Sequence, residues 1–351
     1  MKHRTAALFA ATLTAACALL IFPAQAAAGA LKGVSYSLEI LIPSLYPFMV
    51  LSVFVVRSGL SAKLGKRLEG TTRALFRLPG GTAASVLMSA IGGYPAGARS
   101  VASLYEAGAV NEEQAQRMLY FCVNAGPSFL ITAVGAGFLK SPSSGALLFC
   151  TQLTVFLLLG LISGALGRAE KAGKTPEAKA DPGAVQAFIA SASDGASSVL
   201  SMCCFVILFA ALMNLLRLFP FSPGLSAAVS SLLEVTGGCS DLARLGAPLW
   251  AVAFAVGWGG ICVHFQVFSF TAAIRYSRVR FLFFRFLQGV LSAAVCKFYL
   301  LLLPQSVEAS VGTSGFVSAG LSGSVPASAA LIVLCVILIL SVGRKGLESG
   351  G

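Results

Sequence analysis

Residues Gly92–Arg99 read GGYPAGAR, and residues Gly237–Arg244 read GGCSDLAR. Both stretches begin with paired glycines, end in Ala-Arg and interrupt an apolar region that would otherwise be typical of a membrane helix. Glycine permits turns that strain other residues, and Pro95 prevents a helix from continuing. Breaks of this kind at matching places in two halves of a chain are typical of transporters built as inverted repeats.

The composition indicates a polytopic membrane protein. Of the 351 residues, 57% are hydrophobic and 11% are charged, whereas soluble domains carry about 25% charged residues. Basic loops on the cytoplasmic side explain the net charge of +12, and no basic run interleaved with aromatics predicts nucleic-acid binding. The nine cysteines form no CxxC pair and are interpreted as small buried side chains. Two histidines cannot build a His-rich metal site, so neither a metal nor a cofactor is expected.

Apolar runs long enough to cross a hydrocarbon core of about 30 Å predict about eight transmembrane helices. Most of the 25 Lys and Arg residues then lie on the inner side, with both termini cytoplasmic. The first run is either a cleavable signal peptide, with a cleavage site in PAQAAA at 23–28, or a retained helix. The predicted spans are 6–27, 38–56, 117–138, 144–166, 197–219, 248–270, 286–304 and 326–343.

Two further apolar segments, 80–96 and 224–240, are too short or too broken to span. We expect them to be re-entrant half-helices, which turn at Gly92–Pro95 and at Thr236–Gly238. The predicted topology makes them enter from opposite sides, so that their tips meet near the midplane. Gly-containing breaks also interrupt the spans that follow, with NAGPSF at 124–129 and WGGICV at 258–263. The alternative is that these glycines only allow close helix packing.

Polar residues at membrane depth indicate function by default, because burying them is costly. Arg99 and Arg244 follow the two tips, where helix N-termini add positive partial charge. Together they predict a site for an anionic, carboxylate-bearing solute, which arginine holds with two donors. Snorkelling of the arginines, an ion pair of Lys297 with a nearby acid and a neutral core role for His264 are the alternatives. The predicted substrate-binding residues are Gly92, Gly93, Arg99, Asn124, Gly126, Gly237, Gly238, Asp241, Arg244, His264 and Lys297.

No catalytic motif is present in the sequence, so the chain is predicted not to be an enzyme. Without a P-loop, transport is expected to be gradient-driven, facilitated or powered by a partner. The polar, charged segment 167–195 is predicted to be a flexible cytoplasmic linker. The expected domains are an N-terminal helix with its linker (1–37), a first repeat (38–166), that cytoplasmic linker, a second, inverted repeat (196–304), and an outer loop with a last helix (305–351).

Four stretches carry a resemblance to a known family: LIPSLYPFMVLSVFVVRSGL at Leu41–Leu60, the GGYPAGAR tip, NEEQAQ at Asn111–Gln116 and FCVNAGPSFL at Phe121–Leu130. They resemble the sporulation integral membrane protein family called YlbJ or SpoVV, which belongs with the nucleoside-recognition (Gate) domain proteins. The resemblance covers roughly residues 1–300. It is looser in the second half, where Trp258 and His264 depart from the family pattern.

The resemblance implies two Gate-like repeats and transport of dipicolinic acid, a pyridine dicarboxylate, from the mother cell toward the forespore. It implies a place in the mother-cell-derived outer forespore membrane, with lipid and either a second copy or other sporulation membrane proteins as partners. In this interpretation Arg99 and Arg244 bind carboxylates, the tip glycines donate backbone N–H groups and Asn124 forms a polar wall. The alternatives are transport of another solute such as a nucleoside, and a structural or assembly role in the spore envelope.

Overall fold

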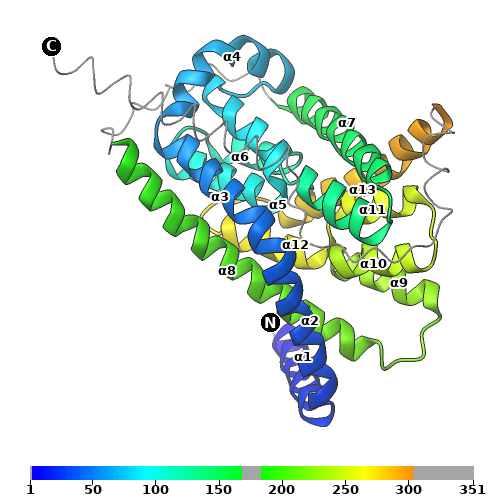
Figure 1. The fold of residues 1–351 in the computed structure, drawn as a ribbon. Helices are drawn as coiled ribbons and strands as arrows, with labels where there is room; N and C mark the ends of the chain where they lie inside the picture. The colour runs from blue at the N-terminus through cyan, green and yellow to red at the C-terminus, as the bar shows by residue number, and fades with distance from the viewer. Residues whose placement is uncertain (1, 168–182, 303–351) are drawn as a thin grey trace. The chain divides into compact units, whose positions relative to one another are not determined.

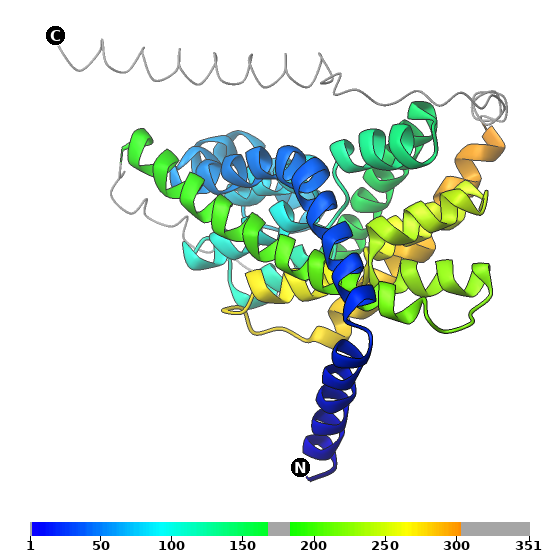
Figure 2. The ribbon, with the colours of Figure 1, turned by 60° about the horizontal axis from the view of Figure 1, so that its bottom comes forward.

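The computed structural model describes residues 2–167 and 183–302, and every regular element in these ranges is a helix (Figure 1 and Figure 2). The elements of residues 2–167 are α1 (Lys2–Ile21), α2 (Pro23–Tyr36), the π-helix η1 (Ser37–Leu41), α3 (Ile42–Arg57), α4 (Leu60–Phe76), the 3₁₀-helix η2 (Gly80–Thr82), α5 (Ala83–Glu106), α6 (Glu112–Leu119), the π-helix η3 (Ser128–Phe138) and α7 (Pro142–Leu166). Those of residues 183–302 are α8 (Ala184–Leu216), α9 (Pro223–Leu233), α10 (Val235–Arg244), α11 (Leu249–Trp258), α12 (Gly260–Phe270) and α13 (Arg278–Leu302). The prediction of an all-α chain is therefore confirmed for the described residues.

Side-chain caps set where several of these helices begin. Asn111 and Gln114 form a capping box at the start of α6, in which each side chain accepts a hydrogen bond from the other residue's backbone N–H. Ser141 and Ser222 accept hydrogen bonds from the first turns of α7 and α9, and a proline follows each of them. These short-range signals explain helix starts that the apolar pattern alone does not locate.

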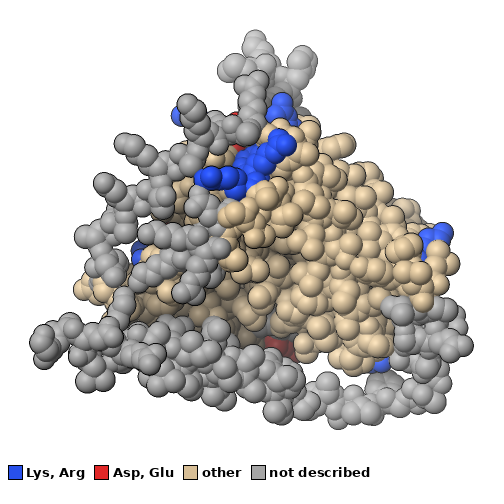
Figure 3. Space-filling view, turned by 90° about the horizontal axis from the view of Figure 1, so that it is seen from above, with Lys and Arg blue, Asp and Glu red and all other residues tan. Residues whose placement is uncertain are grey.

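Four helical segments in the described part of the chain are long and apolar enough to cross a membrane: Pro142–Leu166, Ala184–Leu216, Leu249–Phe270 and Arg278–Leu302. The number rises to six if two bent helix pairs each count as one span. Large apolar side chains point outward on these segments; Leu200 on α8, for example, is 67% exposed. Uncharged residues also dominate the face in Figure 3, where Lys and Arg gather in small groups. Exposed apolar surface of this kind suits contact with lipid.

Eight continuous spans are not confirmed. The predicted spans 144–166, 197–219, 248–270 and 286–304 coincide with the four long segments. The other four differ: 6–27 crosses from α1 into α2 at a bend before Pro23, 38–56 comprises η1 and α3, 117–138 is broken between α6 and η3, and 326–343 lies outside the described residues. Proline and irregular backbone explain these interruptions, because each removes regular helical hydrogen bonds.

The predicted linker 167–195 is wrong over 184–195, because α8 already begins at Ala184. Small residues bury one face of this helical stretch: Ala187 is 1% exposed and Ser191 is 0% exposed. One turn further, a Cβ added to Gly195 would lie 2.8 Å from the side chain of Val50 on α3. Polar composition therefore misled the prediction, since a helix with a small-residue face packs closely on its neighbours. Figure 1 and Figure 2 both show α8 as one long green helix.

Candidate functional site

Helix α5 is a hairpin whose turn lies at Gly93, as the GGYP pattern predicts. Gly93 has φ 85° and ψ 178°, a conformation that glycine adopts without the strain of a side chain. A Cβ added to Gly97 would lie 3.0 Å from Cβ of Ser89, although residues eight apart on a straight helix are about 12 Å apart. The two arms of α5 therefore fold back on each other, and small residues let them touch.

The second hairpin consists of α9 and α10, and its turn lies at Glu234. The sequence placed this turn at Thr236–Gly238, which is wrong, because Gly237 and Gly238 lie inside α10. Glu234 has φ −145° and ψ 120°, an extended conformation that needs no glycine. Gly238 instead permits close packing, because an added Cβ would lie 2.4 Å from Cα of Ser231 on α9.

The carboxylate of Glu234 caps the N-terminus of α10. Its two oxygens accept hydrogen bonds from the backbone N–H groups of Thr236 at 2.8 Å and of Gly237 at 2.6 Å. These groups have no partner within the helix, and the helix dipole favours a negative charge at this end. The side chain is 5% exposed, so a buried carboxylate is part of the hairpin tip.

Each hairpin tip contacts the helix break of its own half. A Cβ on Gly126, in the break between α6 and η3, would lie 3.0 Å from the backbone N of Gly93. A Cβ on Gly260, the first residue of α12 after the break at Gly259, would lie 3.1 Å from the backbone N of Val235. The predicted breaks in the spans 117–138 and 248–270 are thus confirmed, and glycine is needed there for close backbone approach.

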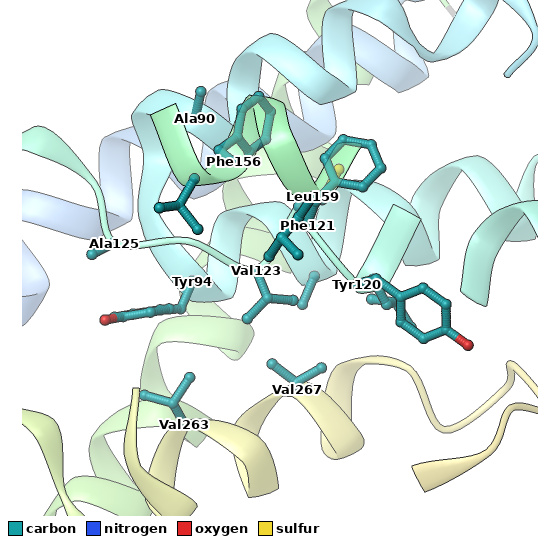
Figure 4. Close-up of a cluster of buried hydrophobic side chains, with 14 of the residues drawn as sticks. Ala90, Tyr94, Tyr120, Phe121, Val123, Ala125, Phe156, Leu159, Val263 and Val267 are labelled. Carbon is teal, nitrogen blue, oxygen red and sulfur yellow. The ribbon is translucent and has the colours of Figure 1, made fainter. Parts of the chain in front are cut away.

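The two halves also touch each other at these tips. The hydroxyl of Tyr94, from the first hairpin, donates a hydrogen bond to the carbonyl of Val256 on α11. Figure 4 shows Tyr94 close to Val263 of α12, and Val123 from the first break lies in the same cluster of buried side chains. The centre of the described structure is therefore built from both halves.

A small cavity lies where the tips and breaks meet. It has a free volume of about 40 Å³, which is room for a few water molecules. The first tip contributes Gly93 and Tyr94, and the second contributes Glu234 and Thr236. Gly126 comes from the first break, Cys262 from the first turn of α12, and Met202 and Val206 from the middle of α8. No Lys or Arg is among the lining residues that the structure describes.

The structure brings some of the predicted binding residues to this cavity. Gly93 and Gly126 line it, and Gly237 holds the carboxylate of Glu234. The other residues in the hairpins and breaks are packed behind the lining; these are Gly92, Asn124, Gly238 and His264. His264 is 1% exposed, and its Nε2 donates to the carbonyl of Trp258 at 3.0 Å.

The charged residues that were predicted to bind the solute lie elsewhere. Arg99 is paired with Glu106 at 3.3 Å and with Asp194 at 3.5 Å. Asp241 accepts hydrogen bonds from Arg217 through both carboxylate oxygens. Arg244 is exposed at the end of α10, and Lys297 is exposed near the end of α13. Gathering of the cations at the tips is therefore wrong for this structure: Arg99 is held by ion pairs, Arg244 and Lys297 are exposed, and none of the three lines the cavity.

Sequence reasoning missed a buried polar face on α13. Arg285 is 0% exposed and donates to the carbonyls of Val123, in the first break, and of Gly257, in the last turn of α11 before the second break. Gln288, one turn later, donates to the side chain of Asn124 at 2.9 Å. Broken helices leave carbonyls without helical partners, and this face supplies donors for them. The signal was a helical spacing of Arg285, Gln288 and Ser292 in an otherwise apolar run.

Among the described residues, no three His, Cys, Asp or Glu side chains are grouped so that they could hold a metal ion. The eight described cysteines are free thiols.

Comparison with known proteins gives one partial relative. The chain is 33% identical over 139 residues to the sporulation integral membrane protein YlbJ of Bacillus subtilis (strain 168). The matched stretch makes up 40% of this chain and 34% of that relative, so the likeness spans about a third of the relative's length. No family model and no solved structure matches the chain.

Proposed function

We propose that this protein is a membrane transporter that moves a small solute by alternating access through the cavity between its two hairpin tips. The observation that carries the proposal is the convergence of two hairpin tips and two helix breaks around that cavity. Irregular backbone at membrane depth persists where protein or a wet cavity satisfies its polar groups. Broken helices around a central site are the usual construction of a secondary transporter.

The proposed inversion of the two halves has support along α8. The first hairpin is paired through Arg99 to Asp194, in the first third of α8. The second is paired through Asp241 to Arg217, just after the end of α8. Both tips reach the cavity that Met202 and Val206 line at the middle of the same helix. Hairpins that attach on opposite sides of the middle of one spanning helix, with their tips meeting between the two attachments, fit an inverted repeat.

The size of the cavity indicates how the transporter works. Room for a few waters is too little for a solute such as dipicolinic acid, so the structure corresponds to a closed state in this proposal. A solute enters when one hairpin moves away from the breaks. We therefore assign the moving parts to α5 and to the α9–α10 hairpin.

For the solute we propose a small carboxylate, with dipicolinic acid as the first candidate, moved from the mother cell toward the forespore. The name of the partial relative supports a role in a sporulation membrane, which we take to be the outer forespore membrane, with both termini cytoplasmic. The start of α10 supports carboxylate binding chemically, because the N–H groups of Thr236 and Gly237 already hold a carboxylate there.

A neutral solute that offers hydrogen-bond donors, such as a nucleoside, is the second candidate. Glu234 in the lining favours it, because an ionised carboxylate repels a dianion and accepts hydrogen bonds from hydroxyl groups. The two candidates therefore predict opposite effects of Glu234→Gln. Removing the charge improves uptake of dipicolinate if the first is right, and weakens uptake of a nucleoside if the second is right.

The test is uptake of labelled dipicolinate and of a labelled nucleoside into vesicles that contain the purified protein, with and without a proton gradient. Glu234→Gln is compared with Glu113→Gln, which changes an exposed acid at the start of α6. Uptake of dipicolinate that Glu234→Gln alters and Glu113→Gln leaves unchanged supports the proposal. Uptake of only the nucleoside overturns the assigned solute, and uptake of neither overturns transport.

A further inference from the structure

Charged side chains in the second arms of the two hairpins attach them to α8. At the first hairpin, the Asp194 carboxylate lies 3.5 Å from Nη2 of Arg99 and also pairs with Arg57 on α3. Arg99 reaches Glu106 of its own helix at 3.3 Å. One acidic side chain of α8 thus holds both the second arm of α5 and the end of α3.

At the second hairpin the pairing has the opposite polarity. The Nη2 of Arg217 donates to both oxygens of Asp241, at 2.9 and 2.8 Å. The hydroxyl of Ser230 on α9 donates to the same carboxylate at 2.6 Å. Asp241 therefore joins α8, α9 and α10 at a single carboxylate, and its hydrogen-bonding capacity is largely used in doing so.

The two attachment points lie on either side of the middle of α8: Asp194 is in its first third, and Arg217 directly follows its last residue. At a rise of 1.5 Å per residue, Asp194 and Arg217 are about 35 Å apart, slightly more than a hydrocarbon core of about 30 Å. The side chains of Arg99 and Asp241 are 17% and 15% exposed. Partial burial strengthens such pairs beyond fully exposed ones, while contact with water leaves them breakable.

We propose that Asp194 and Arg217 are positioning residues that anchor the two hairpins independently at two points of α8, one on each side of the cavity-lining Met202 and Val206, and that release of one anchor opens the cavity from that side. This inference rests on the proposed transport function and deepens it by naming what holds each hairpin closed. The anchors touch no lining residue of the cavity directly, so they act on hairpin position and not on solute contact.

The experiment is hydrogen–deuterium exchange of the purified full-length protein in lipid nanodiscs, with no solute present. Arg217→Gln is expected to speed backbone exchange about tenfold in Pro223–Arg244 and to leave Ala83–Glu106 unchanged; Asp194→Asn is expected to do the reverse. Tenfold corresponds to about 1.4 kcal/mol, the order expected for a charged hydrogen bond lost from a locally opening unit. Arg275→Gln, at an exposed position in the α12–α13 connection, is the matched control and should change neither hairpin.

Exchange that rises equally in both hairpins, or in neither, overturns the proposal. The doubly exchanged variant, Arg217→Asp with Asp241→Arg, guards against a general loss of structure. It should exchange more slowly than Arg217→Gln if the ion pair matters, although it loses the hydrogen bond from Ser230 to Asp241. In vesicles, Arg217→Gln should change the maximal uptake rate at least about threefold while KM stays within about twofold, because the solute contacts remain. If the wild-type chain shows no uptake but each substitution speeds exchange in its own hairpin alone, the anchoring roles of Asp194 and Arg217 are supported and only the proposed transport function is overturned.

Discussion

Gly126→Ala tests whether the first hairpin tip and the first break must be in direct backbone contact. The new Cβ would lie 2.7 Å from the carbonyl oxygen of Ile91 and 3.0 Å from the backbone N of Gly93. Both neighbours are backbone atoms, so neither can rotate away, and one side has to shift by about 0.5 Å or more to reach normal contact. Overpacking of this kind costs about 1–3 kcal/mol, which corresponds to a fall in melting temperature of about 2–10 °C.

The assay is thermal unfolding of the purified protein in one detergent, followed by solute uptake in vesicles. Gly70→Ala is the control, because the structure places nothing within 4 Å of a Cβ at this helical glycine of α4. Alanine there should leave stability unchanged or raise it by about 0.5–1 kcal/mol. Equal melting temperatures for Gly126→Ala and the wild type, or an equal loss for both alanine variants, would refute the packing of tip on break.

Three further substitutions test other contacts of the site by thermal unfolding in the same detergent. Tyr94→Phe removes the buried hydroxyl that donates to Val256 and should cost about 1–2 kcal/mol; no change would mean that the halves are not joined there. Arg285→Met leaves two buried carbonyls without their donors and should lower the free energy of unfolding by about 1–3 kcal/mol for each carbonyl. Arg285→Lys should recover only part of this stability, since a compact ammonium does not replace the two donors of a planar guanidinium. Glu234→Ala removes the cap of α10 and should cost about 0.5–2 kcal/mol, with less loss for Glu234→Gln; equal stability of all three would contradict the capping role.

Local chemistry explains the parts that the sequence predicted well. The first turn was predictable because Gly93 and Pro95 restrict the backbone by themselves, whatever surrounds them. The second turn was not, because at Glu234 a side chain replaces glycine as the device that ends one helix and starts the next. Capping by a glutamate at the turn residue depends on its side-chain rotamer, which the spacing of residues in the sequence does not predict.

The placement of the charges depended on partners that are remote in the sequence. Arg99 and Arg244 follow the two tips in the chain, which made a shared site a reasonable prediction. Asp194 pairs with Arg99 from 95 positions away and holds its side chain against α8 instead of in the cavity. A residue one or two turns from a tip lies about 5–10 Å along the helix from it. This short distance is enough to place an arginine in an ion pair with α8 instead of in the cavity.

The sequence by itself determined that this protein is a helical membrane chain with two interrupted halves, because apolar run length, glycine and proline act over a few residues. Only the tertiary structure decided which charged groups lie near the centre. These are the carboxylate of Glu234 and the guanidinium of Arg285, whereas Arg99, Arg244 and Lys297 do not line the cavity. The reason is that burying a charge is tolerable only where partners converge on it, and such convergence is a property of packed helices rather than of neighbours in the chain.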